Sequence, residues 1–192
     1  MAIVVACVAS VAVIAFAHGR QRDAGPPAML HTTAFSWLHP DALPAAWSNW
    51  RLPASPARLP MPPGWRHEDG DPGTRTVVMR GPAGEIAGYL NATPRQGEET
   101  PGNWSRFRID HNREEGDRDV RLLAAATGLR FREGTGSCVL DSYRTTVGGR
   151  YRELACIVSG RAASTVIVAA APPARWGVEA PTLERAITAF TT

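Results

Sequence analysis

The alternation of apolar and polar residues predicts a chain built mainly of short strands. From residue 47 onwards, segments rich in apolar and β-branched residues are separated by turns that contain glycine or proline. The segment 120–126 fits a strand and a helix equally well. We predict strands over the ranges 47–52, 58–61, 64–67, 75–80, 85–92, 129–132, 137–145, 151–159 and 162–171.

Two other segments have the residue spacing of helices. Asn103 can cap a helix over residues 104–115, and Gly116 can end it. Pro181 can open a final helix, because proline is favoured at the first helical position and apolar residues recur after it at helical spacing. The predicted elements together are those of a small α+β domain.

The N-terminal residues form an apolar leader. Residues 2–17 carry no charge, and this run is short for a membrane span of about 20 residues but suits a signal peptide. Residues 15–17 have the small-x-small pattern of a cleavage site. Arg20 and Arg22 follow the run, and by the positive-inside rule they favour an orientation that leaves the rest of the chain on the cytoplasmic side, opposite to export. We predict a signal peptide or uncleaved signal anchor over 1–17, a linker over 18–45 and a folded domain over 46–192.

Two cysteines lie in segments that we predict to be neighbouring strands. The segments 137–145 and 151–159 flank a Val-Gly-Gly turn signal that begins at Val147. A turn centred there brings Cys138 and Cys156 opposite each other, at a separation that a disulfide closes with slight adjustment. Two buried free thiols are the alternative. Given the leader, we expect the disulfide, which agrees with an oxidising, extracytoplasmic compartment.

Charge and aromatic residues narrow the choice of partners. The net charge is +3, and the 21 basic residues are all arginines that are spread along the chain, some of them beside acidic residues, as at 113–115 and 118–119. Nucleic-acid binding needs a concentrated basic patch, so we expect no nucleic-acid partner. The tryptophans Trp37, Trp47 and Trp50 are core anchors or else a surface for a ligand or partner.

The sequence contains no motif that identifies an active site. His111 and Glu115 would share a helix face, as two metal ligands do, but no third ligand is visible and a solvated acidic edge is the simpler interpretation. Asp141 lies in a β-rich segment, where we expect it to face solvent or to pair with an arginine such as Arg152. We therefore expect no catalytic residue, no metal and no cofactor.

The order of the predicted elements resembles the Mog1/PsbP-like fold. The resemblance rests on the Pro-Pro-Gly-Trp segment within 59–65, the hairpin of 143–151 and the closing helix of 183–190. It implies a curved antiparallel sheet of about six strands packed against two or three helices. The chain also resembles uncharacterised exported proteins of actinobacteria, in segments 88–91 and 112–117. Relatives of this fold are mostly binding modules.

These observations favour an exported, non-enzymatic binding or structural module of the bacterial cell envelope. Its expected partner is an envelope protein or lipid, and the N-terminal segment would hold it at the membrane if uncleaved. Two alternatives remain open. A carrier of a lipid or small apolar ligand predicts an apolar cavity of about 300 Å³ or more. A hydrolase-like enzyme with an unrecognised site predicts a pocket that holds a nucleophile or two carboxylates.

Overall fold

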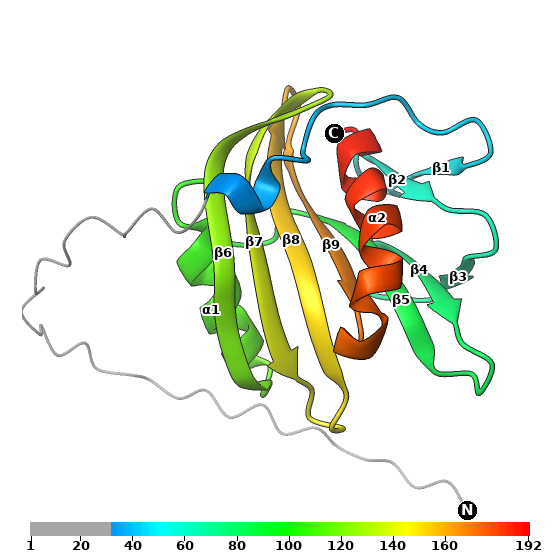
Figure 1. The fold of residues 1–192 in the computed structure, drawn as a ribbon. Helices are drawn as coiled ribbons and strands as arrows, with labels where there is room; N and C mark the ends of the chain where they lie inside the picture. Colours follow the sequence, from blue (N-terminus) through cyan, green and yellow to red (C-terminus); the bar gives the residue numbers. More distant parts are fainter. Residues whose placement is uncertain (1–31) are drawn as a thin grey trace, which may run out of the picture.

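The computed structural model describes residues 32–192, and the predicted signal peptide or anchor lies outside the described residues. Seven antiparallel strands form one curved sheet in the order β3–β4–β5–β9–β8–β7–β6 (Figure 1). The strands are β3 (Arg66–Glu68), β4 (Arg75–Arg80), β5 (Ile86–Pro94), β6 (Arg118–Phe131), β7 (Gly134–Arg144), β8 (Arg150–Gly160) and β9 (Ser164–Ala171). The α+β prediction is confirmed, with one strand more in this sheet than expected.

The observed strands differ from the predicted ones partly because one of them is longer than predicted. The ambiguous segment 120–126 and the predicted strand 129–132 belong to one strand, β6, whose pairing with β7 is interrupted by register shifts. A second, two-stranded sheet pairs β1 (Ser48–Arg51) with β2 (Arg58–Met61).

One helix packs on each face of the large sheet. Helix α1 (Trp104–Glu114) lies against β6 and β7, whereas α2 (Pro173–Ala189) lies against β9 and β5 on the opposite face (Figure 1). Neither helix in the described part of the chain is long and apolar enough to cross a membrane. Each helix contacts some of the seven strands and leaves the others on its face uncovered.

The main core fills the space between the sheet and α2. Alternate residues of the central strands, such as Leu154 and Ile167, meet Leu183, Ile187 and Phe190, and all five are at most 2% exposed. This is the period-two pattern of strands meeting the helical spacing that the sequence shows after residue 181. A smaller apolar cluster under α1 includes Trp104 and Val139.

The tryptophan of the Pro-Pro-Gly-Trp segment packs across β5 at a glycine. Trp65 is 7% exposed and belongs to the main core. A Cβ atom at Gly88 would lie 2.7 Å from Trp65 Cη2, closer than two carbon atoms can approach. Gly88 thus provides the space for the indole ring. Two segments that carry the resemblances noted above are in direct contact.

The structure confirms the predicted start of α1 at Trp104 but corrects its predicted cap, and it corrects the predicted start of α2. Helix α2 begins at Pro173, and Pro181 lies inside it. Pro173 takes the favoured position in the first turn, and the carbonyl that Pro181 leaves without an amide partner belongs to exposed Gly177. Asn103 precedes α1 as predicted, but its side chain makes no cap: Oδ1 accepts a hydrogen bond from the Thr100 amide instead.

The packed part of the chain includes residues that we predicted to be linker. A short 3₁₀ helix, η1 (Thr32–Phe35), packs against β6. Phe35 and Leu38 are 3% and 6% exposed and belong to the main core. Large apolar side chains are buried where a sheet face is free, and α2 does not cover β6.

Candidate functional site: a groove beside helix α1

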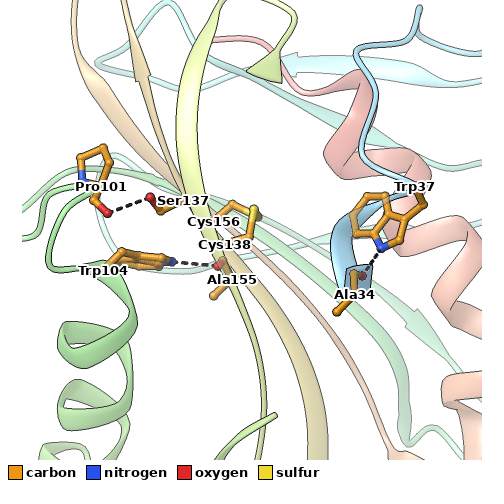
Figure 2. Close-up of a disulfide and its surroundings, with 8 residues drawn as sticks. All are labelled: Ala34, Trp37, Pro101, Trp104, Ser137, Cys138, Ala155 and Cys156. Atoms are coloured by element: carbon orange, nitrogen blue, oxygen red, sulfur yellow. Dashed lines mark hydrogen bonds between the residues drawn. A yellow bond between two sulfur atoms is a disulfide. The ribbon is translucent and has the colours of Figure 1, made fainter. Parts of the chain in front are cut away.

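The predicted disulfide is formed and lies in the main core. Cys138 and Cys156 are paired across β7 and β8 with a Cα–Cα distance of 4.1 Å, and both are at most 1% exposed. Figure 2 shows Trp104 on one side of this strand pair and Trp37 on the other. The bond joins two central strands and is consistent with an extracytoplasmic location. Its burial gives it a structural role.

The three tryptophans proposed as a ligand surface do not form one patch. Trp37 and Trp47 are half-buried and pack against the main core, and Trp37 Nε1 donates a hydrogen bond to the Ala34 carbonyl (Figure 2). Trp50 stacks on His67 with ring centroids 5.3 Å apart. No observation tests a ligand at these residues, so that role stays a prediction.

The α1 face of the sheet carries a groove. Helix α1 covers β6 and β7 there and leaves β4, β5 and β9 without a helix. The uncovered strands and the edge of α1 enclose a groove of about 760 Å³. We call it the α1 groove. Aromatic side chains on its walls include Tyr89, Phe107, Tyr143 and Tyr151.

A buried ion pair stands where α1 meets the sheet. Arg108 Nε donates a hydrogen bond of 2.7 Å to Glu153 Oε1, and the Tyr143 hydroxyl donates one of 3.0 Å to Glu153 Oε2. The Glu153 side chain is 1% exposed. Burial alone would lower the pKa of Arg108, but the charge of Glu153 more than reverses this and the pKa is raised. Burial, followed by Glu153, raises the pKa of Tyr143. Arg108 is therefore charged and held in place.

Asp141 corrects our expectation of an exposed or Arg152-paired carboxylate. Its side chain is fully buried beneath α1, directly across from Glu153 in the β7–β8 register. Neither carboxylate oxygen has a hydrogen-bond partner among residues 32–192. Burial first, and Glu153 second, raise the pKa of Asp141 to about 8. Arg152 points to the other face, where its guanidinium lies 5.6 Å from the ring centroid of Trp176.

The rim of the α1 groove is acidic. Six carboxylates and two guanidiniums line the groove, so its net charge is negative. Glu68 pairs with Arg80, and Glu99 accepts hydrogen bonds from the backbone amides of Gln96 and Gly97. The remaining rim carboxylates belong to Asp69, Asp71 and Glu115.

His111 and Glu115 meet as their helical spacing predicts. His111 Nε2 lies 3.2 Å from Glu115 Oε1, and both side chains are partly exposed at the groove edge. Within residues 32–192 no third metal-ligating side chain joins them. The pair is therefore part of the acidic edge of the groove.

The sequence-based reasoning missed the ion pair of Arg108 and Glu153. The necessary signal lay in the hairpin register that predicted the disulfide. Any register that places Cys138 opposite Cys156 also places Asp141 opposite Glu153. Two carboxylates opposed on the buried face of a sheet require a cation from the covering element, and Arg108 of α1 supplies it.

Comparisons with known proteins identify the fold. No family model matches the chain, and no curated protein matches its sequence. Among solved structures, cyanobacterial PsbP (CyanoP) from Synechocystis is similar at 17% identity and a TM-score of 0.56, over 78% of this chain and 94% of that one. Protein PA94 of Pseudomonas aeruginosa, of unknown function, is similar at 14% identity and a TM-score of 0.50, over 76% and 96%.

A third structure is similar more loosely. LpqN, involved in cell envelope biogenesis of Mycobacterium tuberculosis, has 15% identity and a TM-score of 0.37, over 76% of this chain and 91% of that one. The first two likenesses establish a PsbP-like fold for the described chain, as the order of the predicted elements suggested. A fold at this level of identity does not specify a ligand.

Proposed function

We propose that the protein is an exported, non-enzymatic binding module of the bacterial cell envelope, and that its α1 groove binds cationic groups of a partner protein. The observation that carries this proposal is the combination of aromatic walls and an acidic rim in the α1 groove. Aromatic faces and carboxylates both attract guanidinium and ammonium groups. An arginine or lysine side chain is the chemical class that meets both at once.

The Arg108–Glu153–Tyr143 group supports a binding role because its members hold one another rigid. Both carboxylate oxygens of Glu153 accept hydrogen bonds within the protein, one from Arg108 and the other from Tyr143. Such a group fixes the positions of Tyr143 and of the floor of the groove. Preformed binding sites lose less conformational entropy on association than flexible ones.

The two alternative functions draw less support from the groove. Its volume would accommodate an apolar ligand, but six carboxylates in the lining are unfavourable surroundings for a hydrocarbon chain. Among the residues that the structure describes, none that lines the groove is a serine or a cysteine. The groove does hold more than two carboxylates, but its two buried ones are engaged. Glu153 accepts hydrogen bonds from Arg108 and Tyr143, and Glu99 accepts them from backbone amides, so neither is free to exchange protons with a substrate.

The proposal can be tested by titrating the full chain with N-acetyl-arginine amide and following backbone amide signals by NMR. We expect shifts concentrated on β5 and α1, and none with acetate. The variant Asp69→Asn/Asp71→Asn should bind about three- to tenfold more weakly, since each exposed charge contributes modestly.

The matched control is Asp110→Asn/Glu114→Gln, which removes the same charge from exposed positions of α1 that do not line the groove. It should bind as the unmodified protein does. Shifts scattered over the whole surface, or equal weakening in both variants, would mean that the acidic groove is not a specific cation site.

A further inference from the structure

Arginines that are spread along the sequence gather at one end of the sheet. They occupy neighbouring positions on β6, β7 and β8, at the end where the β7–β8 hairpin turns. Side chains two residues apart on a strand point to the same face, and this face is the one that carries the disulfide and α2. We call the following residues the arginine cluster: Arg118, Arg121, Arg144, Arg150 and Arg152.

Register places three of these arginines side by side. Arg118 is the Cα partner of Arg144, and Arg144 is the Cα partner of Arg150. Like charges directly opposite each other on adjacent strands are destabilising. In the next row, Arg121 and Arg152 flank Ser142. The fold thus concentrates positive charge where an uncharged surface would be more stable.

Among residues 32–192, no carboxylate lies within ion-pair distance of the arginine cluster. The ion pairs of residues 32–192 involve Arg80, Arg108, Arg113, Arg175 and Arg185, and none involves the cluster. Asp119 is the one carboxylate among the residues that line a hollow of about 300 Å³ beside the cluster. Ser142, whose side chain lies on the same face as the cluster, also lines this hollow and brings a hydroxyl group to it.

Apolar and aromatic side chains accompany the charge. Val147 stands at the tip of the hairpin that joins Arg144 to Arg150, and it is 92% exposed. Trp176, in the first turns of α2, lies beneath the guanidinium of Arg152. Arginine with an exposed aliphatic tip and a nearby tryptophan is the composition of surfaces that lie in the headgroup region of a membrane.

We propose that the arginine cluster docks the protein onto an anionic phospholipid membrane, with guanidiniums on the lipid phosphates and Val147 in the headgroup layer. We choose a membrane as the binding partner because of charge complementarity: its plane of phosphates can pair with several adjacent guanidiniums at once. The exposed valine favours a membrane over a free phosphate ion, which would gain nothing from it. This surface lies on the opposite face from the α1 groove, so both can be occupied together.

The test is co-sedimentation of the full chain with vesicles of phosphatidylcholine, either alone or with about a third phosphatidylglycerol, a content that gives a strongly negative surface. We expect tight binding only to the anionic vesicles and a loss of binding at high salt. Arg144→Gln/Arg150→Gln should weaken this binding about 20- to 30-fold, since each arginine near the surface contributes about fivefold.

Two further variants separate the contributions. Arg130→Gln/Arg132→Gln removes the same charge from two exposed positions, one at the far end of β6 and one in the turn that follows it, and should leave vesicle binding unchanged. Val147→Ser keeps the charge and should weaken binding about fivefold, because it removes apolar surface from the headgroup layer. All variants share the same N-terminus, so the differences report on the cluster alone.

Four results would overturn the proposal. One is equal binding to both kinds of vesicle, and another is an equal loss in the Arg144/Arg150 and Arg130/Arg132 variants. The third is competition by millimolar inorganic phosphate together with no effect of Val147→Ser, which would assign the hollow to a free anion. Tighter binding to duplex DNA than to anionic vesicles at the same salt concentration would likewise replace the membrane with a different partner.

Discussion

Asp141 carries the sharpest electrostatic conflict among the residues under α1. Its carboxylate is buried without a hydrogen-bond partner, and Glu153 lies directly opposite. The pKa of about 8 means that Asp141 is protonated in the folded protein at neutral pH. In the unfolded chain its pKa is about 3.9, so folding takes up a proton between these two values.

We therefore predict that the protein loses stability as the pH rises from about 4 to about 8, by an amount of the order of a few kcal/mol. Below this range Asp141 is protonated in both states. Above it the folded state must hold a buried charge. Asp141→Asn should flatten this part of the profile and raise the unfolding free energy at pH 8, as measured by urea denaturation.

The control for this prediction is Asp110→Asn, which neutralises an exposed carboxylate on α1. It should leave the pH profile unchanged. An Asp141→Asn variant whose stability still falls across this range, in parallel with the unmodified protein, would show that Asp141 is already ionised in the fold.

Elements specified by local signals were predicted well, and features that depend on contacts between elements were not. The strand 75–80 and the disulfide hairpin follow from alternation and turn residues within a few positions. The start of α2 was wrong because Pro173 and Pro181 carry the same local signal, and only packing on the sheet selects the first. Arg108 was missed because its role exists only once α1 lies across β8.

The contact between Gly88 and Trp65 gives a prediction about how β5 packs. Gly88→Ala should lower the unfolding free energy by about 1–3 kcal/mol, because the new methyl group would overlap the indole ring. The matched control is Gly177→Ala in α2, where a Cβ meets nothing within 4 Å. That change should be neutral or stabilising by up to about 1 kcal/mol. Thermal unfolding of both variants tests this prediction. Equal melting temperatures of the two variants would contradict the overlap between the new methyl group and the indole ring.

At the scale of the whole molecule, the two helices leave different halves of the sheet uncovered. On the α1 face the open half forms the acidic groove, and on the α2 face one open end carries the arginine cluster. Neither surface was visible in the sequence, because acidic and basic residues are interleaved along the chain. Strand register and the partial cover of each face sort them into two surfaces of opposite charge.

The buried disulfide gives a prediction about the compartment in which the protein folds. A protein whose central strands are joined by a buried disulfide should carry that bond in its native bacterium. Cells quenched in acid and treated with a thiol-alkylating reagent under denaturing conditions should yield Cys138 and Cys156 unmodified, and both should be alkylated once the sample is reduced. Mass spectrometry of the purified chain measures this directly.

That spectrum also reports the N-terminus, since a mature chain that begins at His18 would show cleavage of the predicted leader. Free thiols at both positions before reduction would instead place the domain in a reducing compartment. The extracytoplasmic envelope partner proposed above would then be out of reach. The acidic groove and the arginine cluster would have to be explained by intracellular partners, which makes the thiol state the first property to determine.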